Sequence, residues 1–236
     1  MILILGGTTE GRLAVKVADE AGSPYYYSTR GIQQEIACRN GIHLTGGMDV
    51  EAMTSFCIHH QIRLLVDAAH PFAVGLHQTV YETAIRLNLP VVRVERSYPE
   101  RATDIVWCED YEDAVRQLEK DRIHSLLSLT GVQTIGKLRG YWAKHPCWFR
   151  ILKRDESLAL ARSQGFDEQR IVYYQAEDEE SLLKRLTPQA ILTKESGETG
   201  GFQQKIDAAR MLGIPVYVVK RPSLPDSFMN VTGEYG

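Results

Sequence analysis

The sequence predicts an α/β protein with two similar open, mostly parallel sheets of the Rossmann type, helices on both faces of each sheet, and a cleft between the sheets. Three observations predict this class. Short apolar runs rich in β-branched residues alternate with amphipathic stretches of about 8–15 residues. A glycine-rich loop follows the first apolar run, and part of the sequence pattern recurs 125 residues later.

Each element follows from its own pattern. The predicted strands, in chain order, are Ile2–Leu5, Tyr25–Ser28, Ile42–Leu44, Leu64–Asp67, Val91–Val94, Ile105–Trp107, Leu126–Leu129, Trp148–Leu152, Ile171–Tyr174, Ala190–Thr193 and Val216–Val219. The predicted helices are Gly11–Ala21, Asp49–His59, Gly75–Leu87, Tyr111–Asp121 and Gln203–Leu212. Asp49 is expected to cap the second of these helices. Strand–helix alternation of this kind favours parallel sheets covered by helices.

A repeat indicates two related halves. Gly6-x-x-x-x-Gly11 recurs as Gly131-x-x-x-x-Gly136, and Leu89-Pro90-Val91 recurs as Ile214-Pro215-Val216 at the same shift. One shift that accounts for two separated matches predicts duplication, although coincidence among common α/β turns remains an alternative. We therefore expect an NADP-binding domain over residues 1–98 and a second α/β domain over residues 99–236.

The loop after the first strand is the candidate phosphate site. It keeps glycine at the tight turn and where the helix meets the strand, but has Thr8 at the middle glycine position of the dinucleotide fingerprint. A helix N-terminus with exposed N–H groups suits a pyrophosphate, whereas a plain strand–helix connection is the alternative. Glu10 would repel the phosphates unless it points away. The predicted cofactor-binding residues here are Gly6, Gly7, Thr8, Thr9, Glu10 and Gly11.

The end of the second strand predicts which dinucleotide binds. NAD-binding domains usually place an acidic residue there, but this chain has Ser28, Thr29 and Arg30. Two hydroxyls and a guanidinium suit a 2′-phosphate, which arginine can bind bidentately. We therefore predict NADP(H) as the cofactor; a solvated loop arginine is the alternative.

The end of the fourth strand supplies the candidate acid–base residue. The predicted cofactor-facing residues are Asp67, Ala68, Ala69, His70 and Pro71. Small alanines would let the cofactor lie close, and His70 is the best proton donor by residue type. A histidine that caps the following helix is the alternative role.

The densest polar loop lies in the second half. It follows a predicted strand and combines a lysine, hydroxyls and glycines, which suits an anionic ligand, with a flexible loop as the alternative. Residues 125–236 carry 15 Lys/Arg against 13 Asp/Glu, whereas residues 1–124 carry 12 against 17. The predicted substrate-binding residues are Thr130, Gly131, Lys137, Lys194, Glu195, Ser196, Gly197, Gly200 and Gly201, with Lys194 also a tentative catalytic residue.

Three motifs in order resemble the precorrin-6A reductase and cobalt-precorrin-6A reductase family. They are the opening Leu3–Leu13, the segment Asp67–Ala73, and Lys194–Gly197 with Gly200-Gly201. The resemblance implies a two-domain enzyme of cobalamin biosynthesis that uses NADPH to reduce one double bond of (cobalt-)precorrin-6A, giving (cobalt-)precorrin-6B. The substrate would then be a polycarboxylate macrocycle. Basic residues that could meet its carboxylates are Lys137, Arg139, Lys153, Arg154, Lys194 and Lys205.

Alternatives and exclusions complete the prediction. The proton that accompanies the hydride could come from water, His70 or Lys194. A non-catalytic NADP(H)-binding redox sensor and an NADPH reductase of a smaller substrate remain competing functions. A net charge of −3 does not indicate nucleic acid, and no apolar run approaches the roughly 18 residues of a membrane span. The four cysteines lack metal-site spacing, so we expect a cytoplasmic protein with no metal site and an oligomeric state the sequence leaves open.

Overall fold

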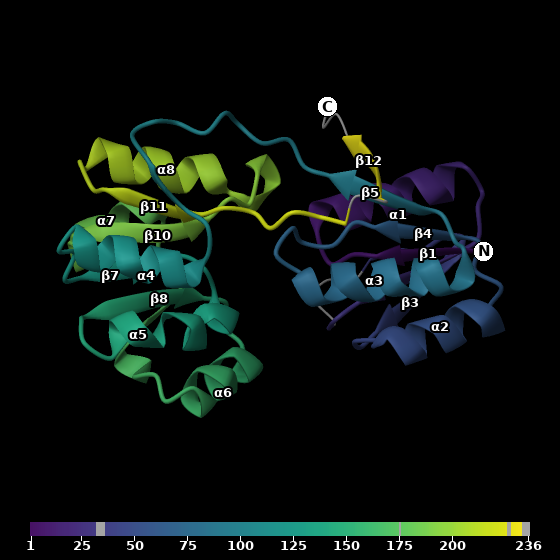
Figure 1. Cartoon of the computed structure of the whole chain (residues 1–236), viewed down its shortest axis with the longest axis horizontal. Coiled ribbons are helices and arrows are strands. Elements are labelled where there is room, and N and C mark those ends of the chain that lie inside the picture. Colours follow the sequence, from purple (N-terminus) through teal and green to yellow (C-terminus); the bar gives the residue numbers. More distant parts are fainter. Residues whose placement is uncertain (32–35, 175, 226–227, 233–236) are drawn as a thin grey trace. The chain divides into compact units, whose positions relative to one another are not determined.

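The computed structural model describes residues 1–31, 36–174, 176–225 and 228–232 (Figure 1). The chain forms two compact units. Unit 1 contains Met1–Ser97 and Pro222–Gly236, and unit 2 contains Tyr98–Arg221. The expected break near residue 98 is close to the first crossing between the units. The expected second domain over residues 99–236 is wrong for its last segment, which belongs to unit 1.

Unit 1 is a six-stranded sheet in the order β12-β5-β4-β1-β2-β3, with every pairing parallel. Its strands are β1 (Ile2–Leu5), β2 (Tyr25–Thr29), β3 (Gly41–Thr45), β4 (Leu64–Asp67), β5 (Val91–Glu95) and β12 (Met229–Thr232). Its helices are α1 (Thr9–Glu20), α2 (Val50–His59) and α3 (Val74–Leu87). Asp49 caps α2 as predicted, since its carboxylate accepts the Ala52 N–H at 2.9 Å.

Unit 2 repeats this design in the order β6-β11-β10-β7-β8-β9, again parallel throughout. Its strands are β6 (Val106–Cys108), β7 (Leu126–Ser128), β8 (Cys147–Ile151), β9 (Ile171–Tyr173), β10 (Ala190–Lys194) and β11 (Val216–Val219). Its helices are α4 (Tyr111–Lys120), α5 (Arg139–Trp142), α6 (Asp155–Ser163), α7 (Glu179–Leu186) and α8 (Phe202–Met211). Short 3₁₀ turns lie at Val132–Thr134, Gly136–Leu138, Glu168–Arg170 and Glu198–Gly200.

Each sheet has one edge strand that lies far in the sequence from the strand it pairs with. These edge strands are β12 in unit 1 and β6 in unit 2. β6 follows β5 of unit 1 along the chain but pairs with β11 of unit 2, and β12 follows β11 but pairs with β5. The segment that forms β6 therefore comes just after the chain leaves unit 1, and the segment that forms β12 comes just after it leaves unit 2. This exchange explains why the last segment was assigned to the wrong domain.

The core of unit 1 lies on both faces of its sheet, because successive strand residues point to opposite sides. Leu3 and Leu5 pack in one cluster with Met53 of α2 and Val80 of α3. Ile4 belongs to a second cluster that includes Val15 of α1. Helices therefore cover both faces of this sheet, and the predicted α/β class is confirmed (Figure 1).

Candidate functional site

In unit 1 the loop between β1 and α1 is a tight turn that only glycine allows at three positions. Gly7 has φ +92°, in the left-handed region. A Cβ at Gly6 would lie 2.3 Å from the Tyr27 ring, and one at Gly11 would lie 2.9 Å from the Cα of Gly6. The glycines thus let α1 start directly over β1, which brings the helix N-terminus to the carboxyl edge of the sheet.

Thr8 joins this loop to the end of β4. Its hydroxyl accepts the Gly11 N–H at 3.1 Å, which caps α1, and donates to the carbonyl of Ala68 at 2.6 Å. The structure therefore brings together two segments that the sequence selected separately, the glycine loop and residues 67–71. The Thr8 hydroxyl is engaged within the protein, so it holds the loop in place.

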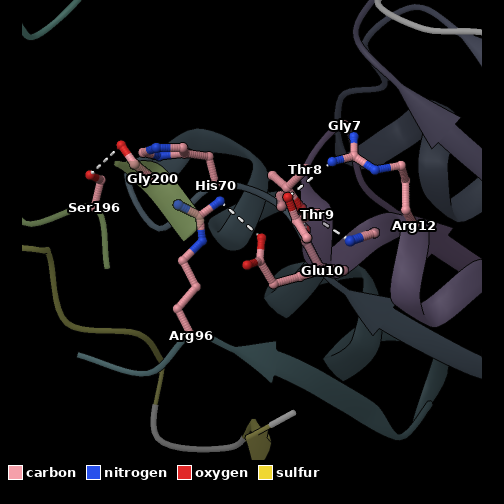
Figure 2. A network of polar contacts seen from close by, with 12 residues as sticks. Gly7, Thr8, Thr9, Glu10, Arg12, His70, Arg96, Ser196 and Gly200 are labelled. Atoms are coloured by element: carbon pink, nitrogen blue, oxygen red, sulfur yellow. Dashed lines mark hydrogen bonds and ion pairs between the residues drawn. The ribbon is translucent and has the colours of Figure 1, made fainter. Parts of the chain in front are cut away.

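The carboxylate of Glu10 is paired with a cation. It is buried and accepts the Nη2–H of Arg96 at 2.9 Å, as Figure 2 shows. Arg96, just beyond β5, is also buried. This ion pair offsets the negative charge of Glu10 near the helix start.

The first turn of α1 keeps donors for an anion. The first N–H groups of a helix have no intrahelical acceptor, and the helix dipole adds a partial positive charge there. Gly7 is different, since its N–H donates to the Tyr27 hydroxyl at 2.9 Å. Burial raises the pKa of Tyr27, which keeps this phenol neutral. Thr9 accepts a hydrogen bond from Arg12 at 3.0 Å (Figure 2), and its hydroxyl keeps its own hydrogen for a further acceptor.

At the end of β2, Ser28 and Thr29 are buried and Arg30 is exposed. The Thr29 hydroxyl donates to the carbonyl of Gly31 at 3.0 Å and lies 2.8 Å from Nε2 of His43 on β3. Because the hydroxyl donates elsewhere, His43 must donate its Nε2–H to it. His43 is a second basic group at this strand end, and the sequence reading missed it.

Asp67 is the centre of a buried ionic cluster below the loop that follows β4. One carboxylate oxygen accepts from Nη1 of Arg93 at 2.9 Å and from the Ala69 N–H at 3.1 Å. The other lies 2.6 Å from Nδ1 of His77 on α3. Arg93 also donates to the carbonyl of Ala69 at 2.8 Å. Asp67 therefore does not face a cofactor with its side chain but fixes the loop that carries His70.

His77 links the buried cluster to the loop that carries His70. Its Nδ1 lies 2.6 Å from the Asp67 carboxylate, and its Nε2 lies 3.1 Å from the carbonyl of His70. The imidazole therefore connects the backbone of His70 to Asp67.

The side chain of His70 has a defined tautomer. Its Nδ1 accepts the Phe72 N–H at 3.2 Å, so a neutral ring carries its proton on Nε2. Ala68 and Ala69 beside it are buried, as is Pro71. The hydrogen bond to Nδ1 positions the His70 ring, and imidazole is a residue type suited to proton transfer.

In unit 2 the loop after β7 differs from its counterpart. Gly131 has φ +88°, but 3₁₀ turns and the four-residue α5 follow it in place of a long helix. Thr130 is buried in a hydroxyl chain with Ser128 and Thr134. The predicted substrate residue Thr130 therefore supports the loop from beneath.

The loop after β10 contains the other predicted substrate residues. Lys194 ends the strand, and Gly197 and Gly201 have φ +72° and +65°. The carbonyl of Gly200 accepts from the Ser196 hydroxyl at 3.3 Å, drawn in Figure 2, and from Nζ of Lys205 at 3.0 Å. Lys205 is buried, and burial lowers its pKa. Lys205 therefore supports this loop and is not a surface contact for a macrocycle.

Glu195 was predicted to bind the substrate, but its side chain is bonded within the protein. Its carboxylate is buried and accepts two hydrogen bonds from Arg101 and one from the Arg221 side chain, plus the Arg221 N–H. It cannot also accept from a substrate, so it acts through the two arginines. The sequence reading missed Arg101 and Arg221, and also the buried Arg93, whose signal was a charged residue inside the apolar strand Val91–Glu95.

Three of the remaining predicted basic residues lie beside aromatic rings. Lys137 is 5.1 Å from the ring centre of Tyr111, Lys153 is 5.9 Å from that of Tyr173, and the Arg139 guanidinium is 5.3 Å from that of Trp142. Arg139 also donates to the carbonyl of Gln164. Arg154 precedes α6 as its N-cap residue, without a side-chain cap bond.

Two Rossmann-type sheets, one of them with a glycine loop that leads into a helix N-terminus, define the class of nucleotide-binding α/β proteins. The model of the precorrin-6x reductase CbiJ/CobK family matches residues 1–234, and the chain belongs to this family. It is therefore a reductase of the precorrin-6 type, which acts in cobalamin biosynthesis. The family implies a nicotinamide cofactor and a tetrapyrrole-derived macrocycle as substrate.

Individual relatives agree with this assignment. A precorrin-6A reductase of Rhodococcus erythropolis is 30% identical over 95% of this chain and 90% of its own length. A cobalt-precorrin-6A reductase of Methanothermobacter thermautotrophicus is 26% identical over 99% of this chain and 78% of its own. The solved structure of CobK precorrin-6A reductase has the same fold, with TM-score 0.77 and 21% identity over 98% of this chain and 91% of that one.

Two further features bear on the sequence expectations. Within the described parts of the chain, no helix has the length and apolar character to cross a bilayer. Over the same residues, no group of three or more His, Cys, Asp or Glu side chains is arranged to hold a metal ion.

Proposed function

We propose that this reductase uses NADPH to reduce one carbon–carbon double bond of a precorrin-6A-type macrocycle. Unit 1 binds the dinucleotide, and the loop after β10 in unit 2 binds macrocycle carboxylates. The observation that carries the proposal is the β1–α1 loop, where the glycines bring the N-terminus of α1 to the carboxyl edge of the sheet and the Glu10 carboxylate is paired with Arg96. The match of residues 1–234 to a reductase family supplies the reaction class.

The residues of unit 1 fit a 2′-phosphorylated dinucleotide. The first turn of α1 suits the pyrophosphate, and β2 ends in Ser28, Thr29 and Arg30 with no acidic side chain to receive a ribose 2′-hydroxyl. Arg30 is exposed and can bind a phosphate bidentately, with His43 as a second basic group nearby. When bound, NADPH supplies the hydride.

The protein residues have positioning and proton-transfer tasks. Asp67, Arg93 and His77 hold the backbone of residues 67–70, so that the buried alanines leave room for a flat ring. We assign proton donation to Nε2 of His70, which completes the reduction when a hydride has been added to the macrocycle. Lys194 and water remain the competing donors, and a pH profile of a His70→Gln variant against Lys194→Ala separates them.

The cofactor assignment is tested by binding and turnover. Replacing Arg30 by alanine should weaken NADPH binding about 10- to 100-fold and leave NADH binding nearly unchanged, because only NADPH carries the phosphate. Arg63, exposed just before β4 at the opposite edge of the same sheet, is the matched control. Equal losses for both dinucleotides would contradict the assignment of the 2′-phosphate.

The substrate assignment is tested by oxidation of NADPH with metal-free and cobalt-loaded precorrin-6A. Turnover of either supports a reductase of the macrocycle, and the ratio identifies the physiological form. Lys194→Ala should raise KM for the macrocycle and leave NADPH affinity unchanged. A chain that binds NADPH but oxidises it with neither macrocycle would instead support a redox sensor or a reductase of a smaller substrate.

A further inference from the structure

We propose that Arg101 and Arg221 form a carboxylate-binding subsite for the macrocycle, with the buried Glu195 as the internal support that orients both guanidinium groups. This inference rests on the proposed function and names a part of its substrate site. All three residues belong to unit 2, and none of the three predicted motifs contains either arginine.

The geometry of Glu195 is that of a support. The residue follows the carboxyl end of β10, and its side chain is only 2% exposed. Oε1 accepts from Nε of Arg101 at 3.1 Å and from Nη1 of Arg221 at 2.7 Å. Oε2 accepts from Nη2 of Arg101 and from the backbone N–H of Arg221, both at 2.9 Å. Four bonds fill the capacity of a carboxylate, so the group is satisfied without a ligand.

The arginines keep donors that Glu195 does not use. Each guanidinium has five N–H hydrogens; Arg101 gives two of them to Glu195 and Arg221 gives one. Their side chains are 44% and 36% exposed, in contrast to the carboxylate that holds them. Two partly exposed cations and one buried anion leave a net positive charge in this group of three side chains.

Aromatic rings restrict both guanidinium groups further. The centre of the Arg221 guanidinium lies 3.7 Å from the ring centre of Tyr98, and that of Arg101 lies 5.4 Å from the ring centre of Trp107. Groups that are already oriented lose less entropy when they bind a ligand. Arginine in such a fixed geometry matches the planar, bidentate shape of a carboxylate better than lysine does.

The position beside Lys194 favours the macrocycle as the source of the anion. Glu195 directly follows Lys194 in the loop assigned to the macrocycle, whereas the helix N-terminus assigned to the dinucleotide belongs to unit 1. Carboxylates and phosphates both suit paired arginines, so the dinucleotide is the other possible source. The experiment therefore titrates the two ligands separately.

The test uses the full chain and the variants Arg101→Lys and Arg221→Lys, which keep the charge that Glu195 needs. Binding of an octacarboxylate porphyrin is followed by fluorescence quenching, NADPH binding by its own fluorescence, and turnover with precorrin-6A by NADPH oxidation. We expect each variant to weaken porphyrin binding and raise the KM for precorrin-6A roughly 10-fold, with kcat and NADPH affinity near wild type. Arg210→Lys is the matched control, since Arg210 in the same unit binds Asp104 through two bonds and is 39% exposed.

The outcomes separate the two proposals. If the wild-type chain neither binds the porphyrin nor turns over precorrin-6A, the proposed function fails and this subsite with it. If the wild type does both and the arginine variants match it, the subsite alone is wrong. A loss of NADPH affinity in the variants would assign the arginines to a phosphate instead. Thermal unfolding checks that each variant is folded, and Arg221→Gln provides a second variant should a lysine disturb Glu195.

Discussion

The two units have equivalent strand orders but differ in the loops that follow the equivalent strands β1 and β7. In unit 1, Gly7 turns the chain and the twelve-residue α1 begins at Thr9, whereas in unit 2 Gly131 leads into 3₁₀ turns and the four-residue α5. A four-residue helix has too few aligned peptides to attract a phosphate strongly. The repeated glycine spacing is therefore compatible with two tasks, and the structure favours unit 1 for the dinucleotide.

The loops after the equivalent strands β4 and β10 show a second contrast. In unit 1, Asp67 is buried with both Arg93 and His77. In unit 2, Glu195 is equally buried, but Arg101 and Arg221 reach solvent. The first arrangement fixes a loop from inside, and the second presents cations outward. Buried charges that lose a partner are far more costly than exposed ones, so the two clusters should respond differently to mutation.

The largest expected effect tests this difference. Asp67→Asn removes the buried anion that pairs with Arg93 and contacts His77, and we expect the free energy of unfolding to fall by about 3–5 kcal/mol. Glu195→Gln should cost less than half as much, because its arginines can turn to water. Urea unfolding followed by circular dichroism measures both. Glu51→Gln, which breaks an exposed pair with Arg86, is the control and should change the free energy of unfolding little. Equal losses for Asp67 and Glu195 would contradict the contrast.

The second effect compares the glycines that end the two repeated motifs. A Cβ at Gly11 meets the backbone of Gly6 at 2.9 Å, while one at Gly136 meets the end of the flexible Gln164 side chain at 2.8 Å. Gly11→Ala should therefore displace the start of α1 and weaken NADPH binding about 10- to 100-fold, which is about 1.4–2.7 kcal/mol. Gly136→Ala should leave NADPH affinity unchanged. Fluorescence titration measures NADPH affinity in both variants. An equal loss of affinity in both would contradict the assignment of the dinucleotide to the loop of unit 1.

Sequence reasoning recovered the fold because hydrophobic periodicity is a local signal. All eleven predicted strands are present, with boundaries that are identical or shifted by one residue. β12 was missed because Met229–Thr232 becomes a strand only through its pairing with β5, far away in sequence. The same long-range pairing determines to which unit the last segment belongs, and no local pattern encodes it.

The candidate site divides in the same way. Glycine spacing and the end of β4 are local, and the structure joins them through the hydrogen bond from Thr8 to Ala68. The partners of Glu195 lie 94 and 26 residues away in the sequence, so its supporting place could not be derived from its neighbours. The loop after β10 was predicted to consist of substrate contacts, but Glu195 and Ser196 form hydrogen bonds within the protein that hold this loop.

A smaller effect separates capping from cofactor binding. Thr8→Val removes the cap of α1 and the bond to Ala68, and we expect a loss of about 1 kcal/mol in the free energy of unfolding together with weaker NADPH binding. Asp49→Ala removes the cap of α2 in the same unit and should cost a similar amount without any change in NADPH affinity. If both variants bind NADPH equally well, the link between the two loops of unit 1 does not serve the dinucleotide.

The smallest effect concerns pH and the loop of unit 2. Burial lowers the pKa of Lys205 below its ordinary 10.5, so the folded chain releases this proton at lower pH than the unfolded chain does. Between the lowered pKa and 10.5 the unfolded state binds more protons, and stability contributed by this residue rises with pH. The free energy of unfolding of the wild type relative to Lys205→Met should therefore increase as pH is raised toward 10.5. The exposed Lys184 of α7 is the control, since Lys184→Met should give a flat difference. Arg93 donates to a loop carbonyl in unit 1 as Lys205 does in unit 2, but arginine side chains do not titrate in this range. If the free energy of unfolding of the wild type relative to Arg93→Met increased with pH in the same way, the pH dependence could not be assigned to Lys205.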